Sequence, residues 1–441
     1  MRLISTAGRS PATDIRTALL RGLAPDGGLY VPESLTPLAP EAMQALRRRS
    51  FPDVALAVAQ HLLGGDLAPE TLERLVTSAF DFPVPVVPLG PRTFVLELFH
   101  GPTLAFKDFG ARFMARLLAA LHGDRDQALT VLVATSGDTG SAVGHAFLGV
   151  PHTRVVILYP EGKVSPTQER QFTTLGGNVR AIAVAGTFDD CQRLAKEALR
   201  DPALAATHRL TSANSINIGR LVAQVFYYFF AWADLPNADA ELLISVPSGN
   251  FGNLTAGLMA KRLGLPVTRF VAATNANDVV PAYLRTGKFA PRPSVATISN
   301  AMDVGNPSNF SRMTALYGGD VDGLRRDVVG SAHTDDETRA CIADVERRFG
   351  YILDPHSAVG YLGLQRPLAE RPDATGVFLA AAHPAKFSGV VEPVIGRPVP
   401  VPERLAGVLR REPVVQRISA ELESLAAVLN QQPTTGDGGR R

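Results

Sequence analysis

The sequence predicts an α/β protein in which a doubly wound, mainly parallel sheet follows a separate N-terminal unit. From residue 94 onward, short apolar runs alternate with segments of helical periodicity, which is typical of parallel strands connected by helices. Residues 1 to 90 lack this alternation. They contain turns and helical patterns and end in the proline-rich stretch 84–91, which favours an extended connector.

Local patterns predict the individual elements. Pro69 suits the first position of a helix, and Ser165 and Thr187 are expected to cap helices, Thr187 together with Asp190. Helical patterns in the N-terminal unit cover 41–49, 51–63 and 69–80, and strands are expected at 94–99, 129–134, 154–159, 179–185, 242–246, 267–272 and 377–382. The polar tail 431–441 is expected to be disordered.

Composition excludes several classes of protein. The 441 residues are 46% hydrophobic and 20% charged, which indicates a globular chain, and a formal charge of +2 argues against a nucleic-acid-binding surface. Cys191 and Cys341 are far apart, which fits a reducing compartment. The N-terminus has no signal-peptide pattern, and the longest apolar run, 221–232, is too short for a membrane span. We therefore expect a cytoplasmic protein without nucleic-acid or membrane partners.

Lys107 is the first candidate catalytic residue. It stands between an apolar run and a helix whose apolar residues, from Phe109 to Leu121, recur every four positions. In the first turn of that helix, among apolar neighbours, burial would lower the pKa of the lysine and make it a candidate for Schiff-base formation. The commoner alternative for such a stretch is an exposed lysine paired with Asp108 or another acid.

Two loops of small residues, 135–141 and 248–253, join expected strands to helices. The unpaired N–H groups at such helix starts favour anions, and ligands of open α/β sheets bind at the carboxyl ends of strands. Neither loop has a GxGxxG or GxxxxGK[ST] fingerprint, and each could be a simple tight turn. A third polar stretch, 212–221, contains Arg220, which is either a phosphate ligand or an ordinary capping or surface charge.

The remaining chemistry is sparse. His145, His356 and His383 are isolated and are expected to be satisfied core residues, so no metal site is predicted. No GxSxG motif is present. A Schiff-base lysine with two or three anion sites fits a pyridoxal-phosphate enzyme acting on a phosphorylated or carboxylated substrate.

Six segments closely resemble the bacterial threonine synthase family: HGPTLAFKDFGARFM, ATSGDTGSAVGHAF, SANSINIGRL, SVPSGNFGNLTAG, SNAMDVGNPSN and AHPAKF. The resemblance extends over essentially the whole chain. It implies the fold type II arrangement of pyridoxal-phosphate enzymes, and the conversion of O-phospho-L-homoserine and water to L-threonine and phosphate. The implied domains are an N-terminal domain (1–90), a large cofactor-binding domain (91–126 and 218–400), a small α/β domain (127–217), and a C-terminal helix with a flexible tail (401–441).

The resemblance also implies roles for single residues. Lys107 matches the lysine that forms the Schiff base with pyridoxal 5'-phosphate, and Phe106 is expected to contact the cofactor beside it. Asp138 matches the position that faces the phenolic oxygen of the cofactor. The cradle for the cofactor phosphate is matched by Gly249, Asn250, Phe251, Gly252 and Asn253. The positions that hold the substrate's carboxylate or phosphate are matched by Thr135, Ser136 and Thr139. The positions that bind the substrate phosphate are matched by Asn214, Ser215 and Arg220.

Two positions raise questions. An ionised Asp138 would repel a phenolate, so either a proton is shared or the geometry differs. Ala381 stands where related enzymes commonly have Ser or Thr beside the pyridine nitrogen, and alanine offers no hydrogen bond there, so that water or nothing would meet that nitrogen.

Other interpretations are a fold type II dehydratase or cysteine synthase, a non-catalytic cofactor-binding homologue, and a nicotinamide dehydrogenase. The Arg220 cluster argues against the first pair, whose substrates lack a γ-phosphate. The intact Lys107 and both loops argue against the homologue, and the missing GxGxxG argues against the dehydrogenase. The chain is expected to be a monomer or a homodimer.

Overall fold

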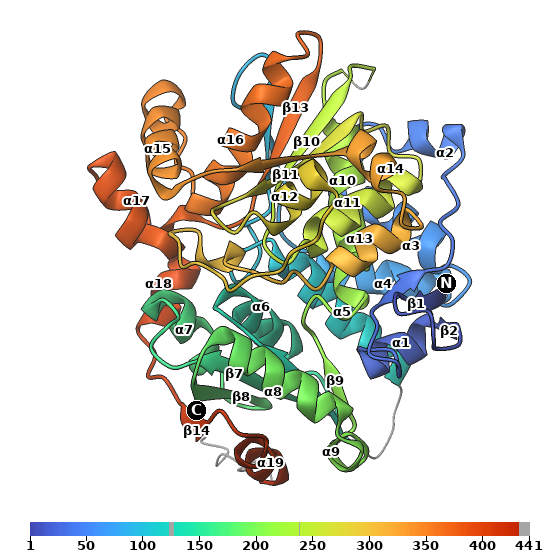
Figure 1. Ribbon diagram of the computed structural model, residues 1–441, viewed down its shortest axis with the longest axis vertical. Coiled ribbons are helices and arrows are strands. Elements are labelled where there is room, and N and C mark those ends of the chain that lie inside the picture. The colour runs from blue at the N-terminus through green and yellow to red at the C-terminus, as the bar shows by residue number, and fades with distance from the viewer. Residues whose placement is uncertain (123–127, 238, 432–441) are drawn as a thin grey trace.

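The computed structural model describes residues 1–122, 128–237 and 239–431, which form three sheets (Figure 1). Within each of the two larger sheets the strands pair in parallel, apart from one edge strand, which confirms the predicted α/β class. We call the six-stranded sheet with its helices the large domain and the five-stranded sheet with its helices the small domain. Apart from Gln431, the tail that was expected to be disordered lies outside the described residues.

The N-terminal unit contains an antiparallel sheet that the sequence did not predict, in which β1 lies between β2 and β3. These strands are too short to show an alternation of apolar and polar residues. They are β1 (Arg2–Ser5), β2 (Thr13–Asp14) and β3 (Tyr30–Pro32). The helices are α1 (Ile15–Arg21), α2 (Pro40–Ala45), α3 (Phe51–Leu63) and α4 (Pro69–Ala79); the last three were predicted, and Pro69 opens α4 as expected.

The large sheet has the order β12-β11-β10-β13-β5-β4. Its edge strand β4 (Val86–Pro88) is antiparallel to β5, so the predicted connector 84–91 contains a strand. The other strands are β5 (Thr93–Glu97), β10 (Leu242–Pro247), β11 (Arg269–Thr274), β12 (Val328–Ala332) and β13 (Thr375–Ala380). The helices are α5 (Lys107–His122), α10 (Gly219–Asp234), α11 (Gly252–Arg262), α12 (Val279–Thr286), α13 (Phe310–Leu316), α14 (Val321–Asp327), α15 (Asp335–Phe349), α16 (Pro355–Ala369) and α17 (Ser388–Ile395), with the 3-10 turns η1 (Asn300–Met302) and η2 (Pro384–Phe387).

Both faces of the large sheet are buried. Ile244 and Val246 of β10 belong to the core that α5, α10 and α11 share, whereas Leu243 between them belongs to the core beneath α15 and α16. Strands buried on both faces are apolar at nearly every position, which is why the sequence shows them as continuous runs and not as alternating ones.

The small sheet has the order β14-β8-β7-β6-β9 and is entirely parallel. Its elements are β6 (Leu129–Ala134), α6 (Asp138–Phe147), β7 (Thr153–Pro160), α7 (Pro166–Thr173), β8 (Val179–Ala185), α8 (Phe188–Arg200), α9 (Pro202–His208), β9 (Leu210–Ser212), α18 (Glu403–Leu409), β14 (Gln416–Ser419) and α19 (Leu422–Asn430). The C-terminal segment thus returns to the small domain, where β14 pairs with β8.

The predicted helix caps of the small domain are confirmed. The Ser165 hydroxyl accepts from the N–H of Gln168 at the start of α7, and Thr187 with Asp190 forms a capping box at α8. Since these caps satisfy N–H groups that the helix itself leaves unpaired, they fix where α7 and α8 begin.

An aromatic cluster holds α5, the helix that begins with Lys107. Phe80, at the end of α4, is 3% exposed, and its ring centre lies 5.7 Å from that of Phe109 and 6.1 Å from that of Phe113 on α5. Phe51 of α3 meets Phe80 edge-to-face at 5.1 Å and Phe109 at 5.5 Å. The N-terminal unit therefore supports the helix that carries the candidate catalytic lysine.

We expect Phe80→Ala to destabilise the fold by about 3–5 kcal/mol, because truncating a buried phenylalanine removes its burial and leaves a cavity. The measurement is the free energy of unfolding in urea. Phe349→Ala is the matched control, since Phe349 is 39% exposed and its truncation should cost far less. Equal losses in the two variants would contradict the proposed support of α5.

Candidate active site

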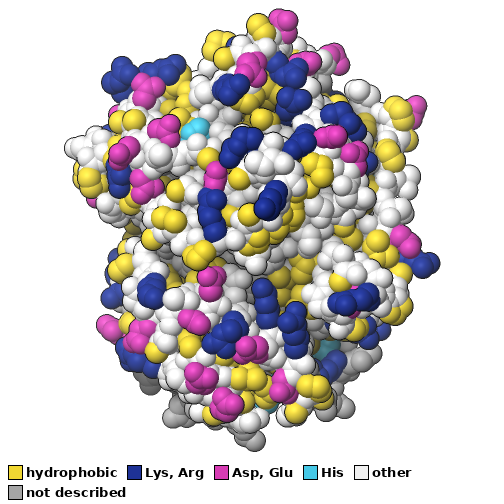
Figure 2. Space-filling model, viewed as in Figure 1, with side chains coloured by type: hydrophobic (Ala, Val, Ile, Leu, Met, Phe, Trp, Pro, Cys, Tyr) yellow, Lys and Arg dark blue, Asp and Glu magenta, His cyan; other side chains and the backbone are white. Residues whose placement is uncertain are grey.

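A cavity lies where the carboxyl ends of β6 and β10 face each other across the two domains. The starts of α5, α6, α10 and α11 line it, together with the turn η1 and the end of β13. Figure 2 shows the surface hollowed between the upper and lower halves of the molecule, with Lys and Arg side chains along its border. Lys196 and Asp303 line both this cavity and a neighbouring pocket. This is the position that parallel sheets use for ligands.

Lys107 is the first residue of α5 and lines the cavity. Burial lowers the pKa of its ammonium to about 8; the Asp138 carboxylate opposes this shift, and Lys386 and Arg220 add to it. Its Nζ lies 5.6 Å from the centre of the Phe106 ring. A lysine with this pKa has a useful neutral fraction near pH 7, as a nucleophile or base requires.

The alternative pairing of Lys107 with Asp108 does not form. Asp108 is fully buried and turns toward Thr103, accepting from its backbone N–H at 2.8 Å and from its hydroxyl at 2.7 Å. Burial raises the pKa of Asp108 to about 6 although these hydrogen bonds lower it. The turn before α5 is further fixed by the Phe106 N–H, which donates to the Ala381 carbonyl at 2.8 Å.

The loop 248–253 follows β10 and opens α11. A Cβ at Gly249 would lie 2.7 Å from the Met302 Cα, so only glycine fits beneath η1. Phe251 adopts a left-handed φ of 58° and directs the chain into the helix that begins at Gly252. The Asn253 carbonyl oxygen of the side chain accepts from the hydroxyls of Tyr227 and Tyr228, while its Nδ2 is buried without a partner among the described residues. The loop thus combines the start of a helix with an unused buried donor, which suits a phosphate.

The loop 135–141 brings Ser136, Asp138 and Thr139 to the cavity. Thr135 is placed differently. Its side chain is fully buried, and its hydroxyl is used inside the loop, where it accepts from the N–H groups of Gly137 at 2.9 Å and Gly140 at 2.8 Å. The cavity lining does not include Thr135. The structure therefore assigns Thr135 a role in shaping the loop.

The stretch that leads into α10, together with the first turn of this helix, supplies a second group of donors. Arg220 is 3% exposed, its Nη1 donates to the Ala213 carbonyl at 2.7 Å, and its Nε has no partner among the described residues. Burial lowers the pKa of Arg220 to about 10, while Asp108 acts in the opposite direction. The Ser215 hydroxyl accepts from the amides of Asn250 at 2.9 Å and Asn309 at 3.1 Å, which leaves its own proton to donate. Asn214 bonds both backbone groups of Ala134 and retains one amide hydrogen.

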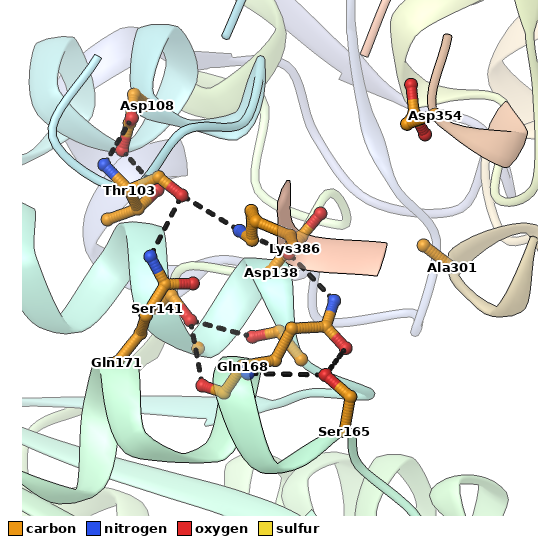
Figure 3. A network of polar contacts seen from close by, with 12 residues as sticks. Thr103, Asp108, Asp138, Ser141, Ser165, Gln168, Gln171, Ala301, Asp354 and Lys386 are labelled. Carbon is orange, nitrogen blue, oxygen red and sulfur yellow. Dashed lines mark hydrogen bonds and ion pairs between the residues drawn. The ribbon is translucent and has the colours of Figure 1, made fainter. Parts of the chain in front are cut away.

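Asp138 has partners that the sequence analysis missed (Figure 3). Lys386 of η2 places its Nζ 2.6 Å from Asp138 Oδ1, and Gln168 of α7 donates to the same oxygen at 2.8 Å. Burial raises the pKa of Asp138, but Lys386 and Lys107 outweigh it and hold the pKa well below its usual range. The AHPAKF segment is one of those that carry the family resemblance, but nothing in its sequence indicates that Lys386 contacts a residue of the other domain.

A buried network lies behind Ala381. The Ala381 N–H donates to the Ser357 hydroxyl at 3.0 Å, and Ser357 in turn donates to Asp354. His356 Nδ1 lies 2.6 Å from Asp354, and its Nε2 accepts from the Ala301 N–H at 3.2 Å, so Nδ1 carries the proton. His356 is satisfied, as predicted, but it also lines the cavity and fixes η1.

The other two histidines predicted to be satisfied, His383 and His145, differ in their hydrogen bonding. His383 accepts from the Ala385 N–H at 3.1 Å, as expected of a satisfied residue, whereas the buried His145 Nε2 has no partner among the described residues. Burial lowers the pKa of His145 to about 4, so it is neutral at pH 7. No cluster of potential metal ligands occurs in the described part of the chain. Within the same residues, no helix is long and apolar enough to cross a membrane.

These residues fit pyridoxal phosphate. The Gly249 loop admits a close backbone approach, Asn253 has a free buried donor, and Lys107 offers an amine with a lowered pKa to an aldehyde. Every predicted site residue except Thr135 lines the cavity: Phe106, Lys107, Ser136, Asp138, Thr139, Asn214, Ser215, Arg220, Gly249, Asn250, Phe251, Gly252, Asn253 and Ala381.

Known proteins resemble this chain over most of its length. Family models described as threonine synthase N terminus, pyridoxal-phosphate dependent enzyme, and threonine synthase C-terminal match residues 2–80, 83–380 and 357–429. A threonine synthase from Haemophilus influenzae is 48% identical over 392 residues, 88% of this chain and 90% of that protein.

Solved structures agree with the family models. The crystal structure of threonine synthase from Escherichia coli matches with a TM-score of 0.91 at 42% identity, covering 97% of this chain and 99% of that one. A pyridoxal-phosphate-bound threonine synthase from Brucella melitensis matches with a TM-score of 0.89 at 37% identity, covering 97% and 98%. The chain therefore belongs to the threonine synthase family of pyridoxal-phosphate-dependent enzymes.

Proposed function

We propose that the chain converts O-phospho-L-homoserine and water to L-threonine and phosphate, with pyridoxal 5'-phosphate as its cofactor. One observation carries the proposal: a lysine of lowered pKa lies in a cavity with two adjoining groups of anion-binding donors. The loop 249–253 would hold the phosphate of the cofactor, and Asn214, Ser215 and Arg220 would hold the phosphate of the substrate. A second group of donors, with an arginine among them, suits a substrate that carries a phosphate of its own.

The residues of the chain divide the chemistry among them. The bound cofactor supplies an electron sink for charge that develops on the substrate carbons. Lys107, in its neutral form, takes the proton from the substrate α-carbon and is placed to act at the β-carbon as well. Arg220 and Ser215 stabilise the charge that grows on the phosphate oxygens as the bond to the γ-carbon breaks.

The other predicted contacts complete the proposal. Ser136 and Thr139 would bind the substrate carboxylate, and Phe106, Asp138 and Ala381 would contact the cofactor ring. We propose that the enzyme works in the cytoplasm, because both of its cysteines are unpaired and buried, and that it is a monomer or a homodimer. The domain borders given above remain part of this proposal.

Lys107→Ala should abolish turnover, because the cofactor loses its attachment and the substrate its base. The measurement is the joint release of phosphate and threonine from O-phospho-L-homoserine. Lys261→Ala, which changes a lysine that pairs with Asp327 away from the cavity, should retain the activity. Normal turnover by Lys107→Ala would refute the assigned role, and failure of the unaltered enzyme to release both products would refute the proposed reaction.

Arg220→Ala should lower kcat/KM for the phosphorylated substrate on the order of 10- to 100-fold, since a charge-assisted hydrogen bond contributes about 1.5–3 kcal/mol. Arg220→Lys should recover part of the loss, because it keeps the charge without the planar fork. Arg366→Ala is the control, as the side chain of Arg366 is 89% exposed. An unchanged kcat/KM in Arg220→Ala would exclude a contact with the leaving phosphate.

Covalent attachment of pyridoxal phosphate to the cofactor-free enzyme should speed up with pH around a midpoint of about 8. Only the neutral amine attacks the aldehyde, so the rate should level off above this pH, whereas a free lysine side chain with a pKa of about 10.4 continues to gain reactivity. Borohydride reduction at each pH, followed by quantification of the labelled Lys107 peptide, gives the profile. A rate that still climbs tenfold between pH 9 and 10 would contradict the lowered pKa.

A further inference from the structure

A buried ion pair joins the two domains beside Lys107. Lys386 lies on η2 of the large domain, and Asp138 opens α6 of the small domain. Their side chains are 0% and 4% exposed, and Nζ lies 2.6 Å from Oδ1. Figure 3 shows Lys386 between Thr103 and Asp138. A buried pair of this kind gains little stability over an apolar pair, so its presence at the cavity calls for another account.

The two partners face the cavity unequally. Asp138 lines it, whereas Lys386 does not. The Lys386 ammonium also donates to the Thr103 carbonyl at 2.8 Å, and that carbonyl accepts from Gln171 of α7 at 3.1 Å. Gln168 holds Asp138 from the small domain at 2.8 Å. Because Lys386 does not line the cavity, it acts on it through Asp138 and through its own charge.

Both charges act on the nitrogen of Lys107. The Asp138 carboxylate raises the pKa of this lysine, while the Lys386 ammonium lowers it. Buried charges act on one another more strongly than exposed ones, because little solvent screens them. A lone Asp138 would hold Lys107 in its charged form, and the lysine could then neither attack an aldehyde nor accept a proton.

We propose that Lys386 is a positioning residue that balances the charge of Asp138, so that the carboxylate stays fixed in the cavity while the nitrogen of Lys107 remains free to lose its proton. The inference rests on the proposed attachment of the cofactor to Lys107. It does not depend on the identity of the substrate.

Other ionisable groups surround this pair and are common to all variants considered below. The charge of Arg220, on α10, lowers the pKa of Lys107. Lys386 interacts electrostatically with Asp108 on α5 and with His383 in the segment before η2. The charge of Lys386 also lowers the pKa of His145 on α6, which is neutral near pH 7. His356, Lys196 and Asp303 line the same cavity.

The experiment is a pH titration of the visible absorbance band of the holoenzyme, which reports the proton on the nitrogen that links Lys107 to the cofactor. Lys386→Met leaves an unbalanced carboxylate and should raise the midpoint by about one pH unit or more. Asp138→Asn leaves an unbalanced ammonium and should lower it. The double variant removes both charges and should return the midpoint toward that of the unaltered enzyme.

Two controls separate charge from structure. Lys386→Arg keeps the positive charge and should therefore leave the midpoint close to that of the unaltered enzyme. Lys261→Met removes a lysine from another lysine–aspartate pair, with Asp327 at 3.1 Å, and should not shift the midpoint. The cofactor-free variants give a second readout, because the pH profile of borohydride-trapped labelling of Lys107 should shift in the same directions.

Opposite shifts that cancel in the double variant would support the proposal. Shifts of the same sign, or unchanged midpoints in Lys386→Met and Asp138→Asn, would overturn it. If Lys386→Met fails to fold, Asp138→Asn and Lys386→Arg still decide, since a midpoint that does not fall in Asp138→Asn contradicts the balance of charges. If borohydride traps no cofactor on the Lys107 peptide of the unaltered enzyme, the proposed attachment is refuted instead, which keeps the two failures apart.

Discussion

The structure depends on placing charged groups in a site with little water and balancing them there. Lys107, Asp138 and Arg220 line one cavity, and Lys386 is buried beside Asp138. A buried charge is costly unless it has a partner. The two groups respond differently to this site: two lysines keep Asp138 ionised, while the pKa of Lys107 falls to about 8. The same desolvation that threatens stability provides a reactive amine near neutral pH.

The fold supplies this arrangement by joining the ends of two parallel sheets. The loops after β6 and β10 each open a helix toward the cavity, and α5 brings Lys107 between them. Packing fixes α5 and the start of α11. The aromatic cluster around Phe80 anchors α5 from the N-terminal unit, and the Gly249 loop packs against η1 with no room for a side chain. Rigidity at these points keeps a charged site ordered.

Sequence patterns predicted the parts of the protein in which local chemistry decides. The apolar strands, the caps at Ser165 and Thr187, and the position of Lys107 at a helix start follow from residues near one another in the chain, and all are confirmed. The N-terminal strands were missed because they are too short for a periodic signal. β14 was missed because its partner, β8, is distant in the chain, and β4 because it is only three residues long within a proline-rich stretch.

The candidate site shows the same division. Motifs led to the residues that line the cavity, but they did not distinguish Thr135, whose hydroxyl closes its own loop, from Ser136, which faces the cavity. They also gave no reason to join Asp138 to Lys386, which lies 248 positions later in the chain and belongs to the other domain. An ionised carboxylate in the cavity was a difficulty for the sequence argument because its counter-charge was not visible there. Once the large domain is folded against the small one, the counter-charge is in place, so the site becomes chemically consistent only when the two domains are packed together.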